Sequence, residues 1–258
     1  MTKRVKRILV TNDDGINAPG LKAAIKIANE LSDDVWVVAP IEEKSGASHS
    51  LSLTQPLRLI KKGAKKYAVT GTPTDCVMFA TRHLLRDDPP TLLVSGVNFG
   101  QNIAEDVSYS GTVAGAKEGT VFGIRSVALS QSISMDDRRK IRFEVGVKHG
   151  ANIIRKLLKL DWPQDTLMNI NFPDIEPDTS CKVRITRQGK REARILCLEE
   201  RLDPRNNSYY WYDFKRESIK AGKGTDIEAI LEGDISITPL KMDHTDTGIK
   251  KRLSALFG

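Results

Sequence analysis

The sequence predicts an α/β protein with a mostly parallel sheet flanked by helices, followed by a smaller β-rich C-terminal portion. Three observations support this prediction. Short aliphatic and β-branched runs recur along the chain, segments with apolar residues at helical spacing separate them, and the pattern changes after residue 172. Short continuous apolar strands are typical of a parallel sheet that is covered on both faces.

The first three elements predict a βαβ unit. Residues 8–11 form an aliphatic strand pattern, residues 21–31 carry apolar side chains at helical spacing, and residues 35–39 form a second apolar run that ends at a proline. Because a strand, a helix and a strand follow one another so closely, we expect the two strands to be parallel neighbours with a right-handed connection.

The remaining elements repeat these patterns. We expect an antiparallel hairpin within 51–69, where short alternating segments, the first at 51–54, surround a lysine-rich turn. Further strands are expected at 91–95, 126–129 and 167–172, and helices at 73–85, 111–121 and about 138–160.

The C-terminal portion has a different character. We divide the chain into an α/β core at 1–172 and a β-rich part at 173–258, whose last strand, expected at 235–239, either returns to the core or is exchanged between subunits. Within it lies an aromatic cluster formed by Tyr209, Tyr210, Trp211, Tyr212 and Phe214. These rings suit packing under a loop or in a subunit interface, and base stacking is the alternative.

Composition narrows the class of protein. No apolar run approaches the roughly 18 residues of a membrane span, and the basic N-terminus leads into a strand pattern, so we expect a cytoplasmic protein without a membrane partner. The three cysteines form no Cys-x-x-Cys pair and the four histidines are scattered, which argues against zinc. A net charge of +7 suits either nucleic acid or phosphorylated substrates.

The most informative stretch follows the first strand, where Asp13 and Asp14 stand side by side before Gly15. Ligands of an open α/β sheet bind at the carboxyl ends of its strands, so this pair is expected at a binding edge. Two adjacent carboxylates repel each other unless a cation or a strong donor compensates them, and oxygen ligands suit Mg²⁺, Ca²⁺ and Mn²⁺. Helix capping or a solvated turn would also explain the pair.

Later loops supply further oxygen atoms. Ser45 follows the second strand, and Asn98 and Asn102 follow the strand at 91–95. If the sheet is parallel, these loops converge on the edge that holds the two carboxylates, where neutral oxygens would complete an open site for a hard cation.

The segment Ser110-Gly111-Thr112 opens the helix at 111–121. A helix N-terminus presents unpaired N–H groups and the positive end of the helix dipole, which suits a phosphate group. The two hydroxyls would add donors, although Ser110 equally suits a simple N-cap.

Together these motifs resemble the family of the stationary-phase survival protein SurE. The resemblance covers nearly the full chain and is weakest at 174–223. The matching motifs, in chain order, are Asn12-Asp13-Asp14-Gly15, Ala18-Pro19-Gly20, Ser45-Gly46-Ala47-Ser48, Gly71-Thr72-Pro73-Thr74-Asp75-Cys76, Ser95-Gly96-Val97-Asn98, Gly100-Gln101-Asn102, Tyr109-Ser110-Gly111-Thr112-Val113, Asn169-Ile170-Asn171-Phe172-Pro173 and Ile235-Ser236-Ile237-Thr238-Pro239.

The resemblance implies a metal-dependent phosphatase of nucleoside 5′- and 3′-monophosphates, with short polyphosphate as a substrate of some members. It implies a Rossmann-like core, one divalent ion such as Mg²⁺ or Mn²⁺, and a β-rich extension exchanged within a homodimer or homotetramer. Carried over by motif, the metal ligands are Asp13, Asp14, Ser45 and Asn98, and the phosphate-binding residues are Asn102, Ser110, Gly111 and Thr112.

For the mechanism we expect direct attack by water on the phosphorus atom. The Asp-x-Asp arrangement of phosphatases that form an aspartyl phosphate is absent, because Gly15 occupies its second acidic position. Either Asp13 or Asp14 could act as the catalytic group that accepts the proton of water.

Two other functions were weighed. A dinucleotide-dependent oxidoreductase is disfavoured because no Gly-x-Gly-x-x-Gly follows the first strand. A nucleic-acid-binding module without catalysis is the stronger alternative, since it would use the positive charge and the aromatic cluster. For a nucleotidase, in contrast, no nucleic-acid partner is expected.

Overall fold

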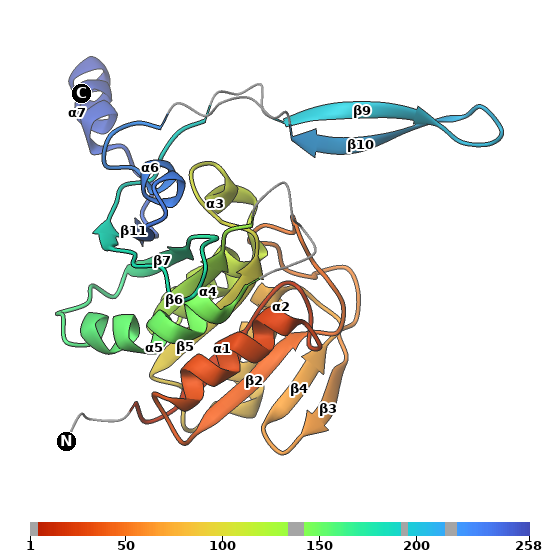
Figure 1. Ribbon diagram of the computed structural model, residues 1–258, viewed down its shortest axis with the longest axis vertical. Helices are drawn as coiled ribbons and strands as arrows, with labels where there is room; N and C mark the ends of the chain where they lie inside the picture. The colour runs from red at the N-terminus through yellow and green to blue at the C-terminus, as the bar shows by residue number, and fades with distance from the viewer. Residues whose placement is uncertain (1–4, 134–141, 192–195, 215–220) are drawn as a thin grey trace.

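The computed structural model describes residues 5–133, 142–191, 196–214 and 221–258. Its centre is one large twisted sheet with helices on both faces, and a two-stranded hairpin projects away from it (Figure 1). This confirms the predicted α/β class with a mostly parallel sheet.

Nine of the strands in the described ranges form the large sheet, in the order β3-β4-β2-β1-β5-β6-β7-β11-β8. The pairs β3–β4 and β7–β11 are antiparallel, and every other neighbouring pair is parallel. The strands are β1 (Ile8–Thr11), β2 (Val35–Pro40), β3 (Leu59–Gly63), β4 (Lys66–Val69), β5 (Leu92–Phe99), β6 (Arg125–Gln131), β7 (Thr166–Phe172), β8 (Val183–Ile185) and β11 (Ile235–Lys241).

The helices cover the sheet in two layers. One apolar cluster joins one face of the sheet to α1 and α5, and a second joins the opposite face to α2 and α4. No helix of the described residues is long and apolar enough to span a bilayer. The α-helices are α1 (Pro19–Asn29), α2 (Pro73–Phe79), α3 (Asp106–Tyr109), α4 (Gly111–Val121), α5 (Glu144–Leu157), α6 (Asp226–Leu231) and α7 (Thr247–Phe257).

Strand β1 shows why the core has two halves. Its side chains alternate between the faces, so Ile8 and Val10 join the cluster with α1 while Leu9 joins the cluster with α2 and α4. All three side chains are fully buried. Burial on both faces explains why the strand reads as a continuous apolar run in the sequence.

The expected strand at 51–54 does not form. Ser52 instead binds Asp75 at the start of α2, with its backbone N–H 3.2 Å and its hydroxyl 2.7 Å from the carboxylate oxygens. The predicted hairpin is therefore confined to β3 and β4, and the long connection from β2 to β3 lies against a helix.

Two predicted helices are shorter than expected. The helix expected at 73–85 is regular only to Phe79, and a π-helical segment, η1 (Ala80–Leu84), follows it. The helix expected at 138–160 runs from Glu144 to Leu157, and residues 138–141 lie outside the described ranges.

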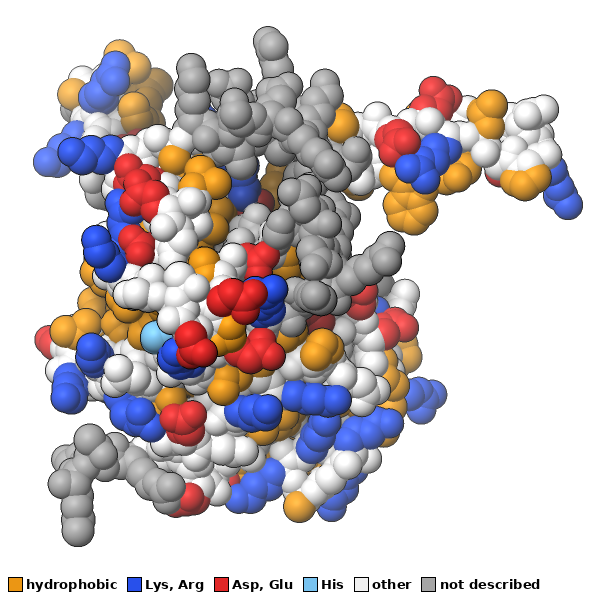
Figure 2. Space-filling view, in the orientation of Figure 1, with side chains coloured by type: hydrophobic (Ala, Val, Ile, Leu, Met, Phe, Trp, Pro, Cys, Tyr) orange, Lys and Arg blue, Asp and Glu red, His pale blue; other side chains and the backbone are white. Residues whose placement is uncertain are grey.

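The C-terminal portion contributes to both parts of the molecule. Strands β8 and β11 extend the large sheet, whereas β9 (Leu196–Leu202) and β10 (Ser208–Phe214) form the projecting hairpin. Figure 2 shows hydrophobic side chains on the surface of this projecting hairpin, and four of its aromatic side chains are exposed. Their exposed fractions are 41% for Tyr209, 57% for Tyr210, 58% for Trp211 and 75% for Tyr212.

Candidate metal and phosphate site

The predicted carboxylate pair lies directly beyond the carboxyl end of β1. Asp13 is buried, with 4% of its surface exposed, and Gly15 turns the chain with φ of +100°, a conformation that favours glycine. The side-chain amide of Asn12 closes this turn by donating to the Gly15 carbonyl at 3.0 Å. The capping alternative is wrong, because the N-cap of α1 is Ala18 and no side chain caps that helix.

Thr112 connects Asp13 to Asn98. Its hydroxyl lies against Asp13 Oδ1 and, at 3.1 Å, against Asn98 Oδ1. Gly111 makes this approach possible, since a Cβ atom at that position would lie 2.8 Å from Asp13 Oδ2. The structure therefore brings three elements together, namely the loop after β1, the end of β5 and the N-terminus of α4.

Asp14 is held on the same edge by a backbone donor. The N–H of Phe99, the last residue of β5, donates to Asp14 Oδ2 at 3.2 Å. Asn98 completes this corner, because its side-chain N–H donates to the Gly100 carbonyl at 2.9 Å and leaves its Oδ1 toward Thr112. Two carboxylates from the loop after β1 and one amide oxygen from the end of β5 thus lie at the ends of neighbouring strands.

The pKa values of both carboxyl groups are raised. Burial is the largest influence on the pKa of Asp13 and raises it, against hydrogen bonds from Thr112 that lower it. Burial, followed by the nearby charge of Asp13, raises the pKa of Asp14 to about 7. Such a pair favours either a bound proton or a bound cation.

Ser45 lies on the loop after β2, beside this pair. The preceding residue binds the site directly, since the Lys44 N–H donates to the Asp13 carbonyl at 2.8 Å. The Ser45 hydroxyl donates to Glu43 Oε1 at 2.8 Å, and the charge of Glu43 raises the pKa of both Asp13 and Asp14. Glu43 is a third acidic residue near the site that the sequence reasoning missed, although it stands two residues before Ser45.

The donor set fits a hard divalent cation. Within the described ranges, no group of three or more His, Cys, Asp or Glu side chains could hold a metal ion. A cation bound by Asp13 and Asp14 would therefore need neutral oxygen atoms. Asn98 Oδ1 shares the Thr112 hydroxyl with Asp13, and Ser45 follows the residue whose N–H binds the Asp13 carbonyl. Two carboxylates with neutral oxygens suit Mg²⁺ or Mn²⁺, which keep several water ligands.

The N-terminus of α4 carries the predicted phosphate-binding residues. Ser110 is its N-cap, and its hydroxyl oxygen accepts the Val113 N–H at 3.0 Å. This confirms the simple capping interpretation, but the hydroxyl hydrogen remains able to donate, because an accepting hydroxyl still has its own O–H. The N-terminus of α4 thus carries backbone N–H groups and two hydroxyls, of which that of Thr112 contacts Asp13.

Asn102 is anchored more deeply than the sequence suggested. Its side-chain N–H donates to Ser130 Oγ at 2.9 Å, and its backbone N–H donates to Asn171 Oδ1 at 2.8 Å. Its carbonyl accepts from the side chain of Asn169 at 2.8 Å. Sequence reasoning gave Ser130 no role, and no local signal would have found it, because the contact spans 28 positions of the chain.

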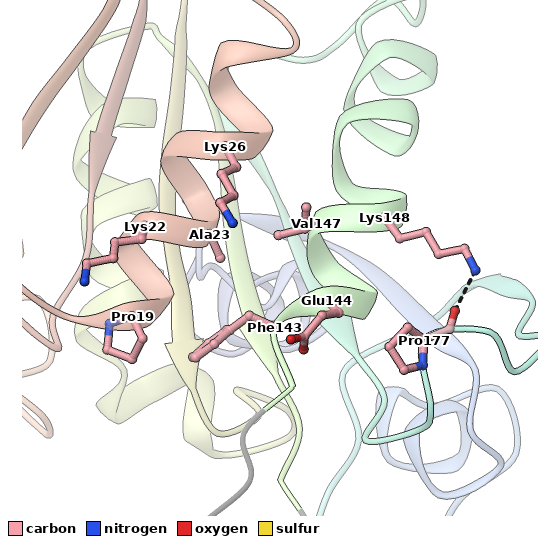
Figure 3. A pocket seen from close by; sticks show the side chains of 9 residues that line it. All are labelled: Pro19, Lys22, Ala23, Lys26, Phe143, Glu144, Val147, Lys148 and Pro177. Atoms are coloured by element: carbon pink, nitrogen blue, oxygen red, sulfur yellow. Dashed lines mark hydrogen bonds between the residues drawn. The ribbon is translucent and has the colours of Figure 1, made fainter.

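A groove of the described surface lies elsewhere, between α1 and α5 (Figure 3). Its volume is about 420 Å³, and none of the candidate site residues lines it. Lys26 and Val147 point into it, while Lys148 is engaged by the Pro177 carbonyl at 2.7 Å and by Asp178 at 3.0 Å. The candidate chemistry is thus concentrated at the sheet edge and not in this groove.

Comparison with known proteins identifies the family of this α/β chain. The family model described as survival protein SurE matches residues 8–195. A protein of Parvibaculum lavamentivorans named 5′-nucleotidase SurE is 53% identical over 98% of this chain and 91% of its own length. A protein of the same name from Azorhizobium caulinodans is 53% identical over 97% of this chain and 98% of its own.

A solved structure agrees with these sequence relationships. The crystal structure of the SurE protein from Aquifex aeolicus superimposes with a TM-score of 0.83 at 38% identity, over 98% of this chain and 100% of that chain. The chain therefore belongs to the SurE family.

Proposed function

We propose that this chain is a metal-dependent phosphomonoesterase that hydrolyses nucleoside 5′-monophosphates, and also 3′-monophosphates and short polyphosphate. The contact of Thr112 with both Asp13 and Asn98 carries the proposal, because it brings the carboxylate site to the N-terminus of a helix. The name 5′-nucleotidase SurE of relatives that are 53% identical supports the nucleotide substrate.

The metal half of the site consists of Asp13, Asp14, Ser45 and Asn98. A divalent cation held by these residues would polarise a phosphoryl oxygen and acidify a water molecule. The same charge would compensate the repulsion that raises the pKa of Asp14 to about 7. Both aspartates would then be ionised at neutral pH, and either could accept the proton of the attacking water.

The phosphate half consists of Asn102, Ser110, Gly111 and Thr112. In the structure Thr112 donates to Asp13, so a substrate must compete with that carboxylate for the hydroxyl. A cation bound by Asp13 would neutralise part of its charge, so the carboxylate would compete less strongly for the Thr112 hydroxyl. The hydroxyls and the positive end of α4 then stabilise the negative charge that the phosphoryl oxygens carry during water attack.

We also propose that the hairpin mediates self-association into a homodimer or homotetramer. Its register places Leu198 opposite Tyr212 and Glu200 opposite Tyr210, so Leu198, Tyr210 and Tyr212 share one face with the exposed Leu202. A lone two-stranded hairpin is marginal in water, and this apolar face gains stability when a second chain covers it.

The nucleic-acid alternative is weakened by the charges of this hairpin. Residues 196–214 contain four acidic side chains, Glu199, Glu200, Asp203 and Asp213, against the two basic side chains Arg201 and Arg205. A hairpin with net negative charge repels nucleic acid, whereas its aromatic surface suits a protein partner.

Phosphate release from a panel of nucleotides tests the proposed activity. The protein is first freed of metal with a chelator and then assayed with Mg²⁺, Mn²⁺ or neither, on 5′-monophosphates, 3′-monophosphates and a short polyphosphate. We expect release only after metal is restored. Metal-independent release, or steeply salt-dependent binding of polynucleotide without any release, would contradict the proposal.

A further inference from the structure

The loop that carries Ser45 is fixed to the rest of the site at two ends. It connects β2 to β3, and no helix or strand interrupts it between Ile41 and Arg58. At its front end the Lys44 N–H donates to the Asp13 carbonyl, and the Ala47 N–H closes a turn onto the Lys44 carbonyl at 3.2 Å. These are backbone contacts, which almost any sequence could make.

At the rear end, side chains add to a backbone contact. The Ser48 N–H donates to the Tyr109 carbonyl at 3.0 Å, and the Ser48 hydroxyl donates to the Ser108 carbonyl at 2.7 Å. The next residue, His49, places its Nε2 atom 2.8 Å from Oε2 of Glu118. Ser45 therefore lies on a short turn between a front anchor on Asp13 and a rear anchor on α3 and α4.

The partner of His49 is a carboxylate inside the protein. Glu118 lies on α4 and is 6% exposed, whereas the side chain of His49 is 31% exposed. Among the described residues, His49 is the only side chain within hydrogen-bonding or ion-pairing distance of the Glu118 carboxylate. A buried carboxylate without a partner is unfavourable, so breaking the hydrogen bond between His49 and Glu118 would cost free energy.

The pair joins the two halves of the site. Glu118 lies seven residues after Gly111 on α4, about 10 Å along the helix axis at the usual rise per residue. The same helix therefore presents its N-terminus to the phosphate and holds the Ser45 loop two turns later. Neither His49 nor Glu118 contacts the carboxylate pair, and the mechanism above assigns them no step.

We propose that His49 is a positioning residue, which fixes the Ser45 turn relative to Asp13 and α4 through its hydrogen bond to Glu118. This inference rests on the proposed function, in which Ser45 is a metal ligand. In this role the pair restrains the loop that carries Ser45, whose neighbour Lys44 contacts the Asp13 carbonyl. Without it, the turn keeps its front anchor and the Ser48 contacts with α3, but it loses its side-chain link to α4.

The test compares four proteins with the parent chain. His49→Ala removes the pair, and His49→Gln keeps an N–H donor near the position of Nε2. In His49→Ala the buried Glu118 carboxylate would lose its partner, and the double variant His49→Ala/Glu118→Gln replaces that carboxylate with an amide. Ser52→Ala is the matched control, because Ser52 ties the same loop to Asp75 beyond the Ser45 turn.

The primary readout is Mn²⁺ binding to the substrate-free protein, measured by calorimetry. Loss of a residue that orients a metal ligand typically weakens metal affinity by about 10–100-fold, so we expect a loss in this range for His49→Ala and for the double variant. His49→Gln and Ser52→Ala should bind nearly as the parent does. The kcat at saturating Mn²⁺ should change little, because no step of the reaction uses His49.

Hydrogen exchange of the amides at 44–48 separates this inference from the proposed function. We expect faster exchange there in His49→Ala and in the double variant, but not in Ser52→Ala. Unchanged exchange together with parental Mn²⁺ affinity in both variants would overturn the positioning role. A parent chain that binds no Mn²⁺ would instead overturn the proposed metal site. The exchange data would still show whether the contact between His49 and Glu118 restrains the loop.

Discussion

The carboxyl edge of the large sheet and the projecting β9–β10 hairpin are both built from strands, but they differ in which side chains they expose to water. At the sheet edge, Asp13 and Thr112 are polar and nevertheless buried. On the hairpin, Trp211 and Tyr212 are aromatic and nevertheless exposed. Each region thus places side chains where folding alone would not favour them.

The comparison shows that each region suits a different kind of partner. Burial raises the pKa of both aspartates at the edge, and a cation would compensate their charge. The hairpin has no apolar layer of its own, and a second protein surface would supply one. Substitutions at the sheet edge should affect catalysis and metal binding, whereas substitutions in the hairpin should affect self-association.

The largest expected effect is the loss of activity in Asp13→Asn. Removing a metal ligand should lower phosphate release about 10³-fold, since the charge stabilisation lost amounts to several kcal/mol. The melting temperature should not fall, because a buried charge disappears together with its desolvation penalty. Asp87→Asn, at a fully exposed side chain, is the control for both measurements.

The next effect is smaller and concerns the phosphate donors. Thr112→Val keeps the shape of the side chain but removes the hydroxyl, and kcat should fall about 10²-fold, the usual result of losing one donor to a developing negative charge. Thr112→Ser should retain most activity. Thr120→Val controls for the same change on α4, where that hydroxyl donates to the Ala116 carbonyl at 2.9 Å. Equal losses in Thr112→Val and Thr120→Val would refute a specific role for Thr112.

A change in the hairpin should affect assembly and leave the chemistry of each chain intact. Tyr212→Ala removes a large side chain from the proposed interface and should weaken self-association roughly 30-fold, equivalent to about 2 kcal/mol of lost burial. Sedimentation over a range of concentrations measures this shift, with Arg205→Ala at the hairpin tip as the control. A parent chain that stays monomeric at high concentration would rule out the proposed interface.

The smallest effect is a pH dependence of metal binding. The pKa of Asp14 is raised to about 7, so in the metal-free protein the folded state holds a proton that the unfolded state has released above its ordinary value of 3.8. The contribution of Asp14 to folding stability is therefore largest below pH 3.8 and declines as pH rises from 3.8 to about 7.

Binding of a cation requires that this proton leave. Mn²⁺ affinity should therefore rise about tenfold per pH unit below the pKa of Asp14 and level off above it. Calorimetric titrations at several pH values on either side of about 7 check this. The same titrations on Asp14→Asn should show a weaker dependence, and an equally steep one would assign the proton to another group.

The sequence allowed much of the site to be predicted because strand ends converge. Asp13 and Asp14 follow β1, Asn98 lies at the end of β5, and these strands are parallel neighbours, so the side chains were expected to meet at one edge. Thr112 could be placed there because it opens a helix, and helix N-termini bind anions. These inferences needed only local patterns and one rule of topology.

Other features depended on contacts between distant segments. Asn171 holds Asn102 from 69 positions away, and His49 meets Glu118 across the same separation, with no local pattern to connect either pair. The missing strand at 51–54 has the same origin, because Asp75 offers Ser52 a better hydrogen-bonding partner than a neighbouring strand. Alternating sequence alone could not reveal that competition.

The central claim is that one divalent cation binds at the edge formed by β1 and β5 and depends on Asp13. The most direct measurement is calorimetric titration of the chelator-treated parent chain and of Asp13→Asn with Mn²⁺, with hydrogen exchange confirming that both are folded. We predict one binding event per parent chain and none of comparable affinity in the variant. Parental binding by a folded Asp13→Asn chain would contradict the account.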